Sequence, residues 1–78
     1  MSRAIRVPVV DSTSDEVYLS DWVKVVGDRL AEGEPIARLE TDKASVDIVA
    51  PASGVLTAIL LHEGDVEPGT VIAEMNEE

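Results

Sequence analysis

Short apolar runs separated by turn sequences make up most of this chain. Val, Ile and Leu alternate with polar residues in these runs, which is the period of a half-buried β-strand. No window of about eleven residues has the 3.6-residue period of a helix. Turn signals recur roughly every eight to twelve residues, which is typical of an all-β sandwich or barrel. The strands are expected over residues 5–10, 16–26, 36–40, 45–50, 55–61 and 70–75.

The second half of the sequence repeats the first. Leu19 to Asp28 aligns with Leu56 to Asp65 at a shift of 37, and Gly33 to Leu39 aligns with Gly69 to Met75 at a shift of 36. Both copies contain Gly-Asp, a second Gly and an apolar strand at nearly the same spacing. We therefore predict one domain made of two similar halves with approximate two-fold symmetry.

The two halves are joined by the stretch from Ile36 to Pro51. Its centre, Thr41-Asp42-Lys43-Ala44, separates two predicted strands and is expected to form a tight hairpin, because Asp favours turn geometry. Lys43 would then stand at the hairpin tip, in solvent. From these residues alone, a solvated charge is the simpler explanation of Lys43.

Composition and charge exclude several classes of function. A net charge of -10 argues against binding to nucleic acid or to an anionic membrane, both of which require clustered Lys and Arg. The chain has no Cys and one His, so no metal site is expected, and no catalytic constellation is apparent. We expect His62 at the surface and Trp22, one of only two aromatic residues, in the core. No apolar run is long enough to span a bilayer. We expect a monomeric domain from the cytoplasm of a bacterium or archaeon, or from the mitochondrial matrix.

Several motifs together resemble the lipoyl domains of 2-oxo acid dehydrogenase multienzyme complexes. The resemblance covers Ile5 to Met75 and is strongest at Glu40-Thr41-Asp42-Lys43-Ala44-Ser45. The other matching segments are Val7-Pro8, Trp22 to Asp28, Gly33-Glu34-Pro35-Ile36, Ala50-Pro51 and Gly54-Val55.

This resemblance implies a flattened barrel or sandwich of two four-stranded antiparallel sheets, with lipoic acid bound to Lys43 through an amide. It implies a swinging-arm carrier: the lipoyl-lysine accepts an acyl group from a thiamin-dependent 2-oxo acid decarboxylase and delivers it to an acyltransferase core for coenzyme A. Dihydrolipoamide dehydrogenase would then reoxidise it, and a lipoate ligase or lipoyl transferase would attach it. The domain itself would be non-catalytic, and the parent chain would be a dihydrolipoamide acyltransferase.

Recognition is expected to involve residues around the hairpin. Asp42 and Ala44 flank Lys43, and Glu40 contributes to an acidic surface together with Asp47. The loop that the family places near the lysine is expected to contribute Asp11, Ser12, Thr13, Ser14 and Asp15. The lipoyl domain is assigned to residues 1–76, with residues 77–78 as the start of a linker.

Two alternatives stay open. A biotin carrier domain of a carboxylase has the same type of fold, but that family has Met on both sides of its lysine, where this chain has Asp42 and Ala44. The second alternative is a β-sandwich module that binds a partner and carries no cofactor. The motifs do not specify which 2-oxo acid is used.

Overall fold

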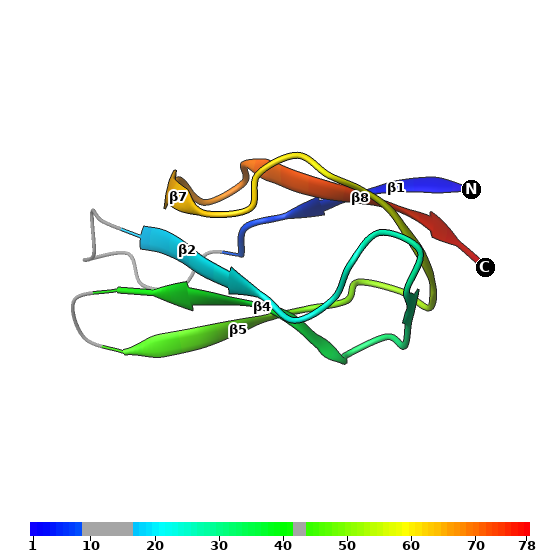
Figure 1. Cartoon of the computed structure of the whole chain (residues 1–78), viewed down its shortest axis with the longest axis horizontal. Coiled ribbons are helices and arrows are strands. Elements are labelled where there is room, and N and C mark those ends of the chain that lie inside the picture. The colour runs from blue at the N-terminus through cyan, green and yellow to red at the C-terminus, as the bar shows by residue number, and fades with distance from the viewer. Residues whose placement is uncertain (9–16, 42–43) are drawn as a thin grey trace.

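Two four-stranded antiparallel sheets pack face to face in the computed structural model (Figure 1), which describes residues 1–8, 17–41 and 44–78. The predicted all-β fold is confirmed. The strands are β1 (Ser2–Arg6), β2 (Val17–Trp22), β3 (Arg29–Leu30), β4 (Pro35–Glu40), β5 (Ser45–Val49), β6 (Gly54–Ile59), β7 (Gly64–Val66) and β8 (Val71–Glu77).

The strand order confirms the two-fold symmetry expected from the repeat. One sheet has the order β1-β8-β6-β3 and the other β5-β4-β2-β7. Exchanging each strand for the one four places away in the chain converts one order into the other. Each sheet is therefore built from both halves of the sequence, and neither half can form a sheet of this kind alone.

The symmetry extends to individual turns. Gly27 and Gly33 have φ angles of 99° and 84°, and their counterparts in the second half, Gly64 and Gly69, have 132° and 89°. These left-handed conformations are open to glycine at little cost. The β2–β4 and β6–β8 pairings also shift register at equivalent places.

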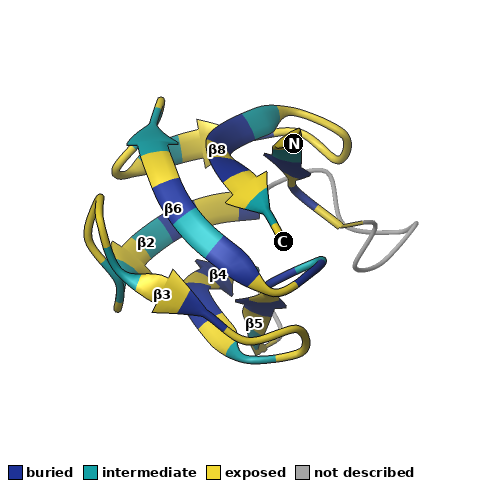
Figure 2. Cartoon of the chain, turned by 90° about the vertical axis from the view of Figure 1, so that its right-hand side faces the viewer, coloured by how far each residue is buried: buried dark blue, intermediate teal, exposed yellow. Residues whose placement is uncertain are grey.

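Aliphatic side chains from both sheets fill the core, and the buried residues are the dark blue segments of the strands in Figure 2. Leu19 and its counterpart Leu56 are fully buried, as are Ile36 and its counterpart Ile72. In the described ranges no polar or charged side chain is buried. The sheets are thus held together by apolar burial, which contributes about 25 cal/mol per Å².

The second strand is shorter than predicted. β2 ends at Trp22, whereas the sequence predicted a strand as far as Val26. The chain turns after Trp22, where the Asp28 amide donates to the Val25 carbonyl and the Asp28 carboxylate accepts from the Val25 amide at 3.0 Å. β-branched residues suggested a strand here, but Val23 and Val25 are 60% and 65% exposed, so burial does not hold them in a sheet.

Two short strands, β3 and β7, differ from the sequence prediction, which gives no strand at either place. β3 contains only two residues and β7 three, too few to show an alternating pattern. The last strand is longer than predicted, since β8 continues past Met75 to Glu77. The Glu77 amide donates to the Met1 carbonyl at 2.6 Å, so pairing with the N-terminal strand extends β8. The first strand is shifted and ends at Arg6, before Pro8.

The molecule is elongated, with extents of 35 × 18 × 17 Å. Both termini lie at one end, and the β4–β5 hairpin points toward the opposite end (Figure 1). In the described ranges no helix has the length and apolar character needed to cross a membrane.

Candidate functional site

The hairpin predicted to carry Lys43 is formed by β4 and β5. Past their last ladder pair, the Thr41 amide donates a hydrogen bond to the Ala44 carbonyl oxygen at 2.9 Å. Two residues, Asp42 and Lys43, connect this bonded pair in the sequence, and both lie outside the described residues. The structure thus defines the flanks of the connection, and the roles of Asp42 and Lys43 stay predictions.

The Thr41 side chain also bonds across the hairpin. Its hydroxyl accepts a hydrogen bond from the Ala44 amide and lies 3.1 Å from the Ala44 carbonyl oxygen, to which it can donate. Thr41 was not among the residues singled out from the sequence. Its role could have been predicted because it is a hydroxyl residue at the start of a turn, where Ser and Thr side chains often form hydrogen bonds with the nearby backbone.

Thr41→Val should destabilise the chain by about 1 kcal/mol, because it removes the hydroxyl that receives the Ala44 amide. Urea unfolding measures the change. The matched control is Thr57→Val, since the Thr57 hydroxyl also donates to a backbone carbonyl, that of Glu74, at 3.1 Å but receives no amide from the described part of the chain. We expect a loss below about 0.5 kcal/mol for the control. Equal losses would show that the Thr41 hydroxyl does not stabilise the hairpin.

The other lysine, Lys24, lies in a different environment. It was predicted to lie in a strand, which is wrong: it follows β2 in the turn, because the chain leaves the sheet at Trp22. Its ammonium forms an ion pair with Glu34 at 3.2 Å. A hydrogen bond from the Ala31 amide, and then the contact with Lys24, lower the pKa of Glu34 below its ordinary value. Lys24 is therefore engaged with a carboxylate that stays ionised.

The residues predicted to take part in recognition are partly described. Glu40 and Ala44 are both exposed, next to the connection. Asp47 is exposed as well, with its carboxylate 3.8 Å from the Arg38 guanidinium. The loop residues 11–15 lie outside the described residues. The structure brings Glu40 and Ala44 to the same end of the hairpin, and a recognition role for all of these residues stays a prediction.

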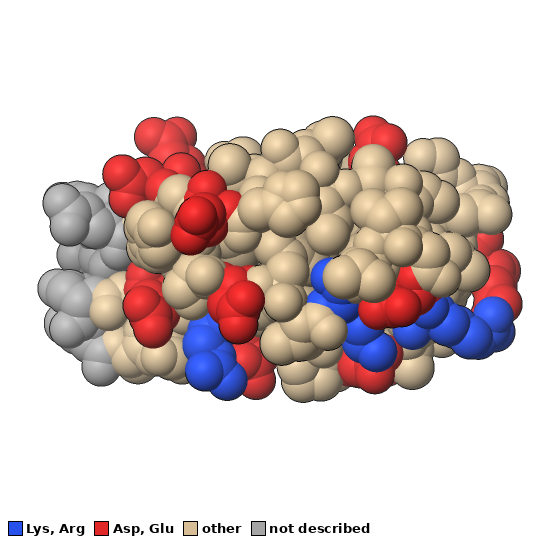
Figure 3. All heavy atoms as spheres, in the orientation of Figure 1, with Lys and Arg blue, Asp and Glu red and all other residues tan. Residues whose placement is uncertain are grey.

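An acidic row crosses the outer face of this sheet near the hairpin. Tyr18 on β2 pairs with Glu40 on β4 on one side and with Asp65 on β7 on the other. Glu40 in turn pairs with Ser45 on β5. Figure 3 shows that acidic side chains predominate on the left half of the visible face, whereas Lys and Arg lie mainly toward the lower right.

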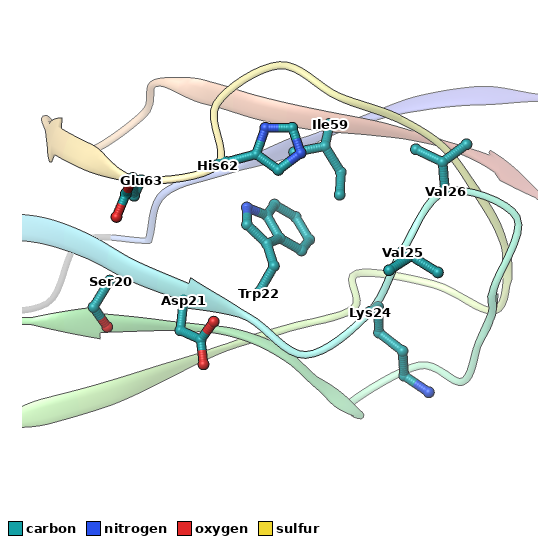
Figure 4. A pocket seen from close by; sticks show the side chains of 9 residues that line it. All are labelled: Ser20, Asp21, Trp22, Lys24, Val25, Val26, Ile59, His62 and Glu63. Atoms are coloured by element: carbon teal, nitrogen blue, oxygen red, sulfur yellow. The ribbon is translucent and has the colours of Figure 1, made fainter.

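A groove of about 390 Å³ opens beside Trp22 (Figure 4). Trp22 was predicted to be a core residue, but it is only partly buried: it packs against the core and also lines this groove. Its indole N–H donates to the Leu61 carbonyl at 2.9 Å, which fixes the ring. His62, expected at the surface, is exposed and lines the same groove.

In the described ranges, no group of three His, Asp or Glu side chains is placed to hold a metal ion. Glu34 is the only described group whose pKa is clearly displaced, and it is exposed enough to exchange protons with solvent.

The sequence profile of the biotin–lipoyl family, described as "Biotin-requiring enzyme", matches residues 3–75. The chain belongs to this family. The match covers all eight strands except the first residue of β1 and the last two residues of β8, and it includes the two residues that connect β4 and β5.

Curated relatives of this biotin–lipoyl chain are acyltransferase components of 2-oxo acid dehydrogenase complexes. It is 42% identical over 74 residues to the dihydrolipoyllysine-residue succinyltransferase component of the 2-oxoglutarate dehydrogenase complex of Staphylococcus saprophyticus, covering 94% of this chain and 18% of that protein. It is 41% identical over 76 residues to the chloroplastic dihydrolipoyllysine-residue acetyltransferase component 5 of the pyruvate dehydrogenase complex of Arabidopsis thaliana, covering 96% and 16%. The mitochondrial human succinyltransferase component is 50% identical over 50 residues, covering 63% and 11%.

These relatives confirm the resemblance to lipoyl domains of 2-oxo acid dehydrogenase complexes. The chain spans less than a fifth of the length of each of them. The similarity therefore concerns one domain of much longer proteins.

Proposed function

We propose that this chain is a lipoyl carrier domain of a 2-oxo acid dehydrogenase complex, with lipoic acid attached to Lys43. The main support is the closed hairpin: the bonded pair Thr41 and Ala44 is linked by two residues, one of which is a lysine. The relatives' names contain "dihydrolipoyllysine-residue" and refer to acyltransferase components of such complexes.

The described residues around this connection fit an attached acyl carrier. The side chains next to it are small or short, since Ala44 and Ser45 follow the connection and both are exposed. The flanking strands are hydrogen-bonded up to the connection, so they present it on a rigid support. A carrier lysine needs this combination, because a ligase must reach its amine and several active sites must then reach the product.

Lipoic acid attached to Lys43 would supply the disulfide that is reduced and acylated. The chain supplies presentation and recognition. Amide formation removes one positive charge, because the protonated lysine amine becomes a neutral amide. The region around the hairpin is thereby made more acidic, next to the row that contains Glu40 and Asp65.

The proposed partners follow from the carrier role. A lipoate ligase or lipoyl transferase would modify Lys43, and a thiamin-dependent 2-oxo acid decarboxylase would acylate the arm. An acyltransferase core, the proposed remainder of the parent chain, would receive the acyl group, and dihydrolipoamide dehydrogenase would reoxidise the arm. The relatives include both succinyltransferase and acetyltransferase components, so we name the class of 2-oxo acid complexes and no single acid.

A biotin carrier is the second candidate, because the matching family is described by its biotin-requiring members. Asp42 and Ala44 argue against a biotin carrier, because the resemblance places Met on both sides of the lysine in that family. No observation favours the cofactor-free interaction module.

The intact mass of the chain, expressed in a host that contains both lipoate and biotin ligases, distinguishes the three functions. We expect the addition of one lipoyl group. An added biotin would support the biotin carrier and contradict lipoate specificity. A chain that stays unmodified although the host's own lipoyl proteins are loaded would contradict both carrier functions.

A further inference from the structure

The groove beside Trp22 is built by two symmetry-related turns. One wall is formed at the end of β2 and in the turn that follows it, by Trp22, Lys24, Val25 and Val26. The other is formed at the end of β6 and just after it, by Ile59, His62 and Glu63. These two segments are equivalent at a shift of 37, so Trp22 faces its counterpart Ile59 across the groove (Figure 4). The groove is therefore a consequence of the two-fold arrangement, located where the two halves meet on one broad face.

One end of the groove is apolar. Val25 and Val26 are 65% and 55% exposed, and they lie with Ile59 and the Trp22 ring around the same space. An aliphatic side chain of a partner would remove all four from water, and such burial is worth about 25 cal/mol per Å².

The other end is acidic. Asp21 and Glu63 lie at the end nearer to the β4–β5 hairpin (Figure 4), and neither carboxylate forms an ion pair in the described part of the chain. Lys24, also on the rim, is already paired with Glu34 at 3.2 Å. The unpaired charge at the groove is thus negative, in a chain with a net charge of -10.

This groove is close enough to the hairpin for one partner to cover both. β2 runs from the acidic row at Tyr18 to the groove at Trp22, a distance of about 13 Å for four residues of extended chain. A protein interface of ordinary size buries about 800 Å² on each partner, which is ample for this span.

We infer that the groove anchors an extended segment of the 2-oxo acid decarboxylase, with an aliphatic side chain in the apolar end and a neighbouring Arg or Lys on Asp21 and Glu63. The inference rests on the proposed carrier function. The decarboxylase is chosen over the ligase because the ligase must enclose the Lys43 amine itself. The decarboxylase receives the far end of the arm in its active site. The protein surface around the entrance to that active site can therefore contact the broad face of the domain that includes the groove. An anchor there orients the domain while the arm reacts.

Reductive acylation of the fully lipoylated domain by its cognate decarboxylase tests the inference. Val25→Ser with Val26→Ser should lower kcat/KM roughly tenfold, the size of an interface anchor. Asp21→Asn with Glu63→Gln should lower it roughly fivefold at low salt and less at high salt, because salt screens exposed charges.

The chain offers a matched control. Val23 and Leu60 are 60% and 58% exposed, are equivalent by the two-fold symmetry, and do not line the groove. Val23→Ser with Leu60→Ser should therefore leave kcat/KM within about twofold of the unmodified sequence. Urea midpoints of all variants verify that the fold is kept. If the groove variants react like this control, the inference is wrong.

Trp22 gives a second measurement, because it is the only tryptophan in the chain. The ¹⁵N-labelled lipoylated domain has a single indole resonance, which should shift or broaden when the decarboxylase is added. No change at saturation would overturn the inference. Slower lipoylation of the groove variants with unchanged acylation would assign the groove to the ligase and also overturn it. Failure of the carrier function is recognised separately, because the unaltered chain would then carry no lipoyl group.

Discussion

Lys43→Arg is expected to abolish lipoylation completely. Arginine keeps the positive charge, but its guanidinium is not an acyl acceptor, so no amide can form at this position. The chain then contains only one lysine, Lys24, whose ammonium is held by Glu34 at 3.2 Å and is only 23% exposed. Intact mass after expression with lipoate and its ligase measures the outcome directly.

Lys24→Arg is the matched control, since it makes the same exchange at the other lysine. Its lipoylation should equal that of the unaltered chain, because arginine can keep the ion pair with Glu34. Both variants should unfold within about 0.5 kcal/mol of the unaltered chain, the usual range for surface substitutions. A lipoyl group that persists on the Lys43→Arg variant would refute Lys43 as the sole attachment site.

The fold was largely predictable because the two halves of the sequence repeat the same short motifs of glycine and apolar residues. Gly27 and Gly33 recur as Gly64 and Gly69, and each of these positions needs a left-handed backbone that glycine adopts readily. In the strands that follow Gly33 and Gly69, apolar residues recur at matching positions in the two halves. Local turn chemistry and apolar alternation thus both indicate the same arrangement of two halves.

The ends of the strands were not predictable from the same pattern. Val23, Val25 and Val26 have the β-branched side chains of a strand, yet the side chain and amide of Asp28 hold this segment in a turn. β3 was missed because two residues carry no periodicity.

The candidate site also has one part that could be predicted from the sequence and one part that could not. The motif around Lys43 and the hairpin flanks follow from local sequence. The groove does not, because Trp22 and Ile59 are 37 residues apart and meet only through the two-fold arrangement of the sheets. From the sequence, a single tryptophan in an aliphatic chain indicates a core residue, and no pattern shows that its side chain also lines a groove.

Gly54→Ala is expected to cause the largest loss of stability, about 3 kcal/mol. Gly54 begins β6, is buried, and pairs with Glu77 at the end of the neighbouring strand β8. A Cβ atom placed there would lie 2.0 Å from the Asn76 carbonyl oxygen and 3.0 Å from the Glu77 Cα. Both are backbone atoms of the paired strand, so no side-chain rotation can relieve the clash. β8 must move away, and overpacking of this kind costs about 1–3 kcal/mol or more.

Such a loss would be a large part of the total, since domains of this size have about 5–15 kcal/mol of stability. The urea midpoint measures it, and amide exchange should locate the damage at the β6–β8 pairing. Gly33→Ala is the control, because its φ of 84° disfavours alanine but nothing lies within 4 Å of the added Cβ. We expect about 1 kcal/mol for this variant, the cost of the left-handed conformation alone.

The comparison separates two reasons for glycine in this fold. The counterpart of Gly54 in the first half is Val17, which is buried with a complete side chain at 4% exposure. The two-fold symmetry by itself therefore does not require glycine at this position. The requirement arises from the close approach of β8, whose C-terminal end reaches Glu77 and pairs with Gly54. If Gly54→Ala costs no more than Gly33→Ala, β8 yields easily to the added methyl group and the tight contact at Asn76 contributes little to the fold.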